Sequence, residues 1–280
     1  MSVNAVLRSE WTKIRSVRPV LWSLPLAAAL LVGIGAGVTG TVGPEEADGP
    51  GFDPVQLGYY GILFAHVVVI VFAVLVVGNE YQHGAIRVSL AAVPRRGLMY
   101  TAKLAVGAVL ALVAGVVASL GTFFLSQRLL GEHGMAFGDA GTVRAIAVGA
   151  LYFPLLAVMC MGFTAMLRSL MLSMGVLVPV LFLVSPVLAE IPGLKELAWY
   201  LPDRAGQYGL RLDPAVAAPY SPMAGVLVMA VWAAAVLRCG GRQAEDLLER
   251  LVDHQLLEPP AGACEGYAFP PLVRLHAREQ

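Results

Sequence analysis

The sequence has little charge for its length. Of its 280 residues, only 14% are Asp, Glu, Lys or Arg, whereas soluble domains carry about 25%. Hydrophobic residues make up 58%. A soluble chain of this length would need far more polar surface, so the composition excludes an ordinary soluble protein. The net charge is zero, and only the distribution of charge along the chain is informative about partners.

Cysteine is scarce, and the common catalytic motifs are missing. The three cysteines, Cys160, Cys239 and Cys264, are too few and too scattered for a disulfide framework or a zinc site. The sequence contains neither a G-x-x-x-x-G-K-[ST] phosphate-binding loop nor an H-E-x-x-H motif. We therefore predict that this chain is not an enzyme and that it holds no metal ion and no cofactor of its own.

What the sequence does have is long apolar runs. About 20 apolar residues in helical conformation span a hydrocarbon core roughly 30 Å thick. The runs predict an all-α polytopic membrane protein with six transmembrane helices, at about residues 20–38, 57–77, 104–125, 145–167, 170–189 and 222–237.

Basic residues are concentrated in alternate connections between these runs. Up to Arg242, eleven Lys and Arg residues fall in one set of segments and five in the other. Short basic loops remain on the cytoplasmic side of a membrane. We therefore predict a plasma-membrane protein with both termini in the cytoplasm. The longest connection on the opposite side, residues 190–221, contains Trp199, Tyr200 and Tyr208, which favours short re-entrant or interfacial helices.

The connection after the second span is short and basic. It contains a single acid, Glu80. Ile86 and Leu90 lie four residues apart with Arg87 beside them, a spacing that suits one or two helical turns ending at Pro94. Such a helix would present a rigid surface to a cytoplasmic partner. The simpler alternative is that Glu80 marks the water boundary and the basic residues only fix the topology.

The pattern of residues 2–18 predicts an amphipathic helix ahead of the first span. Leu7, Trp11 and Ile14 fall at helical spacing, and basic residues occupy the other faces. This pattern is typical of a helix that lies in the plane of the membrane interface. The alternative is a basic leader that only obeys the charge bias.

His66 is an ionisable residue inside the second predicted span. Such residues are candidates for a transport pathway. The alternative is a neutral histidine whose hydrogen bonds are satisfied by a neighbouring helix.

Two segments resemble a known family. The first is Glu10-Trp11-Thr12-Lys13-Ile14-Arg15-Ser16, and the second is Glu80-Tyr81-x-x-Gly84-x-Ile86-Arg87, followed by Leu90, Pro94-Arg95-Arg96 and Lys103. With six spans, they resemble the permease subunit of an ABC-2 type transporter of the kind common in high-GC actinobacteria. The resemblance covers about residues 4–240. One departure is Ala85, where many members have Thr.

The resemblance implies a function and partners. In that family the loop after the second span docks on a separate ABC ATP-binding subunit, and two permease chains, identical or different, enclose the path. ATP and Mg would then bind the partner subunit. We expect export of an amphipathic small molecule or lipid across the bilayer, without a nucleic-acid partner. The expected coupling residues are Glu80, Gly84, Ile86, Arg87, Leu90 and Pro94.

The tail differs from the rest of the chain. We predict a permease domain over residues 1–242 and a cytoplasmic tail over residues 243–280. The segments 247–258 and 267–279 resemble the winged-helix portion of NB-ARC type signalling ATPases. The alternative function is therefore a membrane-anchored signalling or regulatory protein that acts through this tail.

Overall fold

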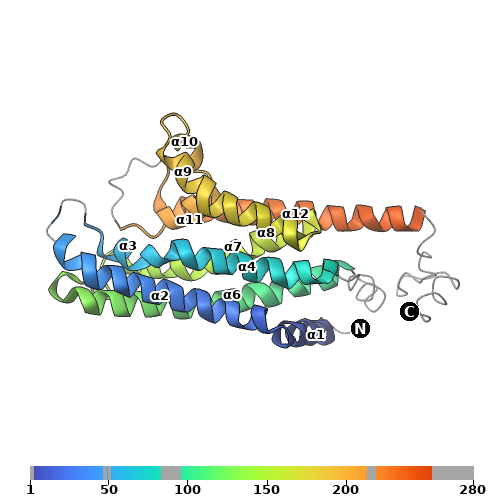
Figure 1. Ribbon diagram of the computed structural model, residues 1–280, viewed down its shortest axis with the longest axis horizontal. Helices are drawn as coiled ribbons and strands as arrows, with labels where there is room; N and C mark the ends of the chain where they lie inside the picture. The colour runs from blue at the N-terminus through green and yellow to red at the C-terminus, as the bar shows by residue number, and fades with distance from the viewer. Residues whose placement is uncertain (1–2, 47–48, 50–51, 83–95, 213–218, 254–280) are drawn as a thin grey trace.

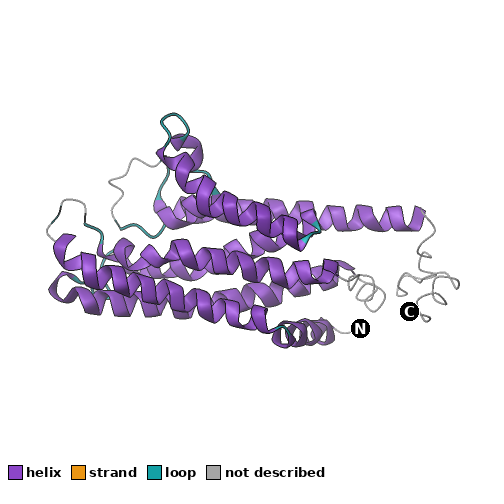
Figure 2. Cartoon of the chain, viewed as in Figure 1, coloured by secondary structure: helices purple, strands orange, loops and turns teal. Residues whose placement is uncertain are grey.

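The structure is a computed structural model that describes residues 3–46, 49, 52–82, 96–212 and 219–253 (Figure 1). These residues form helices and connecting loops, and no strand occurs among them (Figure 2). In chain order the elements are α1 (Val3–Ser16), α2 (Arg18–Glu46), α3 (Pro54–Gly58), η1 (Tyr59–Gly61), α4 (Ile62–Tyr81), α6 (Arg96–Leu130), η3 (Gly131–His133), α7 (Thr142–Leu167), α8 (Leu170–Pro179), the π-helical turn η4 (Val180–Val184), α9 (Ser185–Glu190), α10 (Lys195–Ala198), α11 (Pro202–Tyr208) and α12 (Pro222–Asp253).

Six helical stretches are long and apolar enough to cross a membrane. They confirm the predicted all-α polytopic membrane protein. Helices α2 and α6 extend beyond the spans that hydropathy predicted. Helix α2 continues to Glu46, and α6 begins at Arg96, so Lys103 lies inside a helix instead of in a loop. A helix satisfies its own backbone hydrogen bonds and can therefore continue past the apolar part of its sequence.

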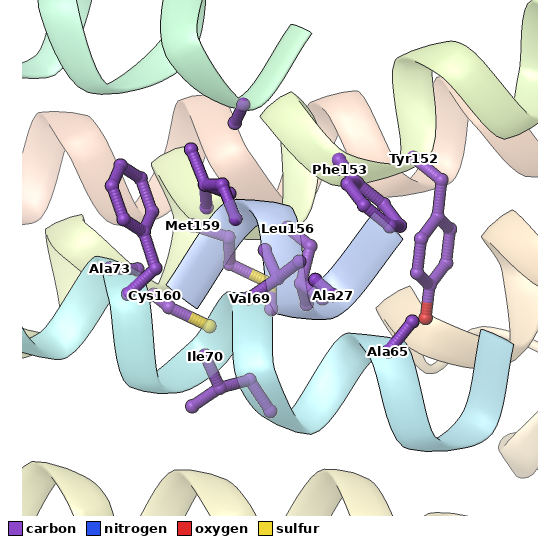
Figure 3. Close-up of a cluster of buried hydrophobic side chains, with 14 of the residues drawn as sticks. Ala27, Ala65, Val69, Ile70, Ala73, Tyr152, Phe153, Leu156, Met159 and Cys160 are labelled. Carbon is purple, nitrogen blue, oxygen red and sulfur yellow. The ribbon is translucent and has the colours of Figure 1, made fainter. Parts of the chain in front are cut away.

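Helices α4 and α7 are at the centre of the bundle. In their most apolar windows 67% of residues are buried, against 22–33% in the other four spans. Figure 3 shows Val69 and Ala73 of α4 meeting Leu156 and Met159 of α7, with Ala27 of α2 beside them. Lipid tails are as apolar as these side chains, so close van der Waals packing holds such a core together.

Gly115 marks the close approach of α6 and α7. A Cβ atom added there would lie 2.5 Å from the carbonyl oxygen of Ala150. Nearby, the Ser119 hydroxyl on α6 donates a hydrogen bond to the carbonyl of Ile146 at 2.8 Å. The same hydroxyl is hydrogen-bonded to the Tyr59 hydroxyl. The polar groups of three segments are thus satisfied inside the bundle.

The fifth span contains a π-helical turn. Pro186 has no N–H to donate to the carbonyl four residues back, and the Ser185 N–H bonds the carbonyl of Val180, five residues back. The longest connection then contains two short helices, α10 and α11; their re-entrant or interfacial position stays a prediction. These elements lie at the end of the bundle opposite α1 (Figure 1).

The sixth span belongs to a longer helix. Helix α12 runs from Pro222 to Asp253 without a break at Arg242, where we predicted the boundary between permease domain and tail. The boundary itself stays a prediction. The segment that resembles a winged helix lies mostly outside the described residues.

Candidate functional site

Four charged side chains form one ion network at the α1 end of the bundle. Lys103 Nζ lies 2.5 Å from Glu10 Oε2 and 2.8 Å from Glu80 Oε1. Lys13 Nζ lies 2.7 Å from Glu10 Oε1 and 3.1 Å from Glu80 Oε1. Each lysine therefore contacts both acids, and the formal charges cancel. We call these four residues the α1-end network.

The network is unequally buried. The side chains of Glu10 and Lys103 are 2% and 6% exposed, and that of Glu80 is 14% exposed, whereas Lys13 is 42% exposed. Burial opposes ionisation of Glu10, but Lys103 and Lys13 outweigh it and hold the pKa of that carboxyl below its usual value. Burial likewise opposes the charge on Lys13, and Glu10 and Glu80 reverse this effect and raise its pKa. Glu10 and Lys13 are thus both held in their charged forms.

The network joins three helices that the sequence separates. Glu10 and Lys13 belong to α1, Glu80 to the last turn of α4, and Lys103 to the second turn of α6. Residues 82–95 connect α4 to α6, so both ends of this connection are tied to α1. The pairing fixes the N-terminal helix against the two spans that bracket the predicted coupling loop.

The structure gives Glu80 a partner that the sequence did not reveal. Its carboxylate is bound by two lysines of the same chain. The other predicted coupling residues, Gly84, Ile86, Arg87, Leu90 and Pro94, lie outside the described residues, and their role stays a prediction.

The residues predicted for the interfacial helix separate into two environments. Ile14 is buried against the core with Val20 and Leu24 of α2. Trp11 is 43% exposed, and Leu7 is half-buried. Helix α1 therefore has an inner face that packs on the protein and an exposed face with Trp11. Insertion of the exposed face into a membrane interface stays a prediction.

A cavity of about 270 Å³ lies at the opposite end of the bundle, between the start of α4, the segment α9–α11 and the residues that follow. We call it the α11-end cavity. Two hydrogen bonds hold the backbone of Arg211 and Leu212 beside the cavity. Asp53 Oδ2 accepts from the backbone N–H of Leu212 at 2.7 Å, and Arg144 Nη2 donates to the carbonyl of Arg211 at 2.5 Å. The polar and aromatic part of its lining comprises Gln56, Tyr59, Tyr60, Trp199, Arg204, Gln207, Tyr208 and Arg211.

His66 lies one helical turn along α4 from this cavity. Its side chain is fully buried, and neither ring nitrogen has a hydrogen-bond partner among the described residues. The Phe182 ring is edge-on at 6.2 Å, and the Arg204 guanidinium interacts with the imidazole electrostatically. The alternative of a histidine satisfied by a neighbouring helix therefore has no support in the part of the chain that the structure describes.

Asp203 is the buried acid of this region. The Ser185 hydroxyl donates to its Oδ2 atom at 2.6 Å, while Oδ1 has no partner within the described ranges. Burial raises the pKa of Asp203, and the Ser185 hydrogen bond and the Arg204 charge offset this only in part. Asp203 is the neighbour of Arg204 in the chain but does not line the cavity.

Comparison with known proteins identifies the family. The family model described as ABC-2 family transporter protein matches residues 6–189, from α1 through most of α9. The chain belongs to this family. A search of curated proteins and a search of solved structures returned no match.

Membership in the ABC-2 family makes the chain a transmembrane component of an ABC transporter and a multi-pass membrane protein. The match includes Glu10, Lys13, Glu80 and Lys103, so the whole α1-end network falls within it. It ends before α10, so Arg204 and Arg211 lie beyond it.

Sequence reasoning about this ABC-2 family chain missed Glu10 and Lys103 as site residues. One signal was available: Glu10 is the one acid in a basic N-terminal segment. Arg204 and Arg211 were assigned to a loop, and no local pattern marked them. No group of three or more His, Cys, Asp or Glu residues suited to a metal ion occurs in the described ranges.

Proposed function

We propose that the chain is the transmembrane subunit of an ABC exporter for an amphipathic small molecule or lipid. A separate ABC ATP-binding subunit hydrolyses ATP with Mg and docks on the connection between α4 and α6. The observation that carries the proposal is the α1-end network, because it holds both ends of this connection and the N-terminal helix in one unit. Family membership supports the transporter assignment.

The network provides a route for force. A push on the connection reaches α4 through Glu80 and α6 through Lys103. It also reaches α2, because α1 ends at Ser16 and α2 begins at Arg18. Three of the six spans therefore respond to one docking event. In this proposal Ile86 and Leu90 supply apolar contacts to the ATP-binding subunit, and Arg87 sets its orientation.

The charge bias supports the orientation. The α1 end faces the cytoplasm, both termini are cytoplasmic, and the membrane is the plasma membrane. The exposed apolar side chains of α6 and α12, such as Val113, Val117, Leu227 and Val231, suit lipid or a second permease chain. In this arrangement the α11-end cavity lies at the outer surface.

The test is the ATPase activity of the complex in reconstituted membranes. Charge reversal of Glu80 is unsuitable, because it would place a third positive charge in the α1-end network and would disturb the fold. We choose Ile86→Asp with Arg87→Glu in the docking segment. The matched control is Leu194→Asp with Lys195→Glu, which makes comparable changes at two adjacent exposed positions outside the spans, away from the α1 end.

The proposal predicts that the docking variant loses most of the transport-stimulated ATP hydrolysis while the chain remains in the membrane. The control variant should keep normal stimulation once its amount in the membrane is matched. Normal stimulation and transport in the docking variant would refute a role of this connection in coupling. Loss of stimulation in both variants would show a general effect on assembly and would also count against the proposal.

A further inference from the structure

The lining of the α11-end cavity is positively charged. Arg204 and Arg211 line it, and no acidic residue of the described chain does. Both arginines are half-buried. Arginine presents a planar fork of donors that matches a phosphate or carboxylate group. The lining therefore selects for an anion.

An unpartnered donor supports the same conclusion. Arg204 lines the cavity, and its Nε is buried and has no hydrogen-bond partner among the described residues. Buried polar groups without partners are rare in folded proteins and call for an explanation. A ligand that accepts hydrogen bonds supplies one.

The size and the apolar part of the lining define the rest of the ligand. Pockets for drug-sized ligands have volumes of roughly 300–1,000 Å³, so a cavity of about 270 Å³ suits a head group. Ile62, Leu63 and Pro186 form its apolar side. Next to them in the chain, Phe64 and Val187 are exposed apolar side chains. An apolar tail that leaves the cavity would therefore meet apolar surface or lipid.

We propose that the α11-end cavity binds the phosphate group of an anionic amphiphile, with Arg204 and Arg211 as its ligands. The identification of this amphiphile as the transported molecule rests on the proposed function. The binding itself does not, because it requires neither ATP nor the ATP-binding subunit.

Trp199 reports on binding because it lines the cavity. The full-length chain is reconstituted in phosphatidylcholine vesicles that contain either brominated phosphatidylglycerol or brominated phosphatidylcholine, and tryptophan quenching is measured. The difference between wild type and Trp199→Phe isolates the Trp199 signal. We expect several-fold stronger quenching by brominated phosphatidylglycerol. Equal quenching by the two lipids would overturn the proposal.

The arginines are tested with a matched pair of variants. Arg204→Gln with Arg211→Gln removes two positive charges from the cavity. Arg128→Gln with Lys195→Gln removes two from exposed positions outside its lining. Each charge-assisted hydrogen bond contributes about tenfold to affinity. We therefore expect the first variant to need at least about tenfold more phosphatidylglycerol for half-maximal quenching, and the second to behave like wild type. Equal shifts in both variants would overturn the proposal.

A soluble competitor separates the two sources of phosphate. If glycerol phosphate displaces brominated phosphatidylglycerol, the cavity binds a phosphate group from soluble molecules as well as from lipids. If it does not, the cavity binds the phosphate only as part of the lipid. If the double arginine variant fails to fold, Arg211→Gln alone retains the test, because the backbone carbonyl of Arg211 still accepts from Arg144. Normal lipid binding with absent ATPase stimulation would refute the proposed function alone.

Discussion

Lys13 and Lys103 offer a direct test of how burial determines the strength of an ion pair. Each lysine contacts both Glu10 and Glu80, within 2.5–3.1 Å. Replacing either one by Met leaves the same net charge in the α1-end network. The two positions differ in burial, since Lys13 is 42% exposed and Lys103 is 6% exposed.

The expected costs follow from this difference. Loss of an exposed ion pair costs about 0–1 kcal/mol of folding free energy, and Lys13→Met leaves both acids in contact with Lys103. Loss of one partner of a buried pair costs about 3–5 kcal/mol, because the remaining charge stays buried. Lys103→Met leaves the buried Glu10 with only the half-exposed Lys13. We expect a cost near the lower limit, about 3 kcal/mol.

The free energy of unfolding is measured in mixed detergent micelles with a denaturing detergent, with tryptophan fluorescence as the probe. Arg15→Met is the control, because Arg15 is an exposed basic residue of α1, and such surface changes stay within about 0.5 kcal/mol. Equal destabilisation by Lys13→Met and Lys103→Met would refute the argument from burial. A second check is the pair Glu10→Leu with Lys103→Met, whose combined cost should be smaller than the sum of the single costs.

Three further predictions follow from the structure and the sequence. The pKa of Glu10 is held below its usual value of 4.5, so its ionised form stabilises the fold at neutral pH. The difference in unfolding free energy between wild type and Glu10→Gln should therefore shrink as the pH falls below 4.5. A difference that stays constant with pH would contradict the pairing. Gly115→Val should lower the free energy of unfolding by about 1–3 kcal/mol in the same assay, because the new Cβ atom would lie 2.5 Å from the Ala150 carbonyl oxygen. Gly33→Ala is the control and should not lower it, because a Cβ atom at Gly33 meets nothing within 4 Å. Truncation after Arg242 should leave transport intact in a secretion assay, because all six spans precede this position; loss of a transcriptional response instead would favour the signalling alternative.

Hydropathy predicted the six spans because the bilayer imposes one requirement on each of them, about 20 apolar residues in a row. It misplaced the start of α6 for a reason that lies elsewhere in the chain. Lys103 interrupts the apolar pattern, and a charged residue at that point predicts a loop. In the structure its charge is balanced by Glu10, 93 residues earlier in the chain. A helix tolerates a buried lysine that is paired in this way.

The candidate sites were predicted only in part, for the same reason. Glu80 and His66 were conspicuous, since each is an isolated ionisable residue in or beside an apolar run. Their neighbours were not, because Lys13 and Arg204 come from distant helices and look locally like ordinary surface charges. Only the folded chain brings Lys13 of α1 to Glu80 of α4, and Arg204 of α11 close to His66 of α4.

The α1-end network also limits how the connection between α4 and α6 can move. Separating α1 from these helices would break the Glu10–Lys103 pair and would also expose Ile14, which packs on the core. Alternative conformations of a protein usually differ by only a few kcal/mol, so a motion that keeps the network intact is favoured. Helix α1 should therefore move together with the last turn of α4 and the first turns of α6. In the proposed transporter, the N-terminal helix is then part of the moving unit, and the force of docking is shared by α2, α4 and α6.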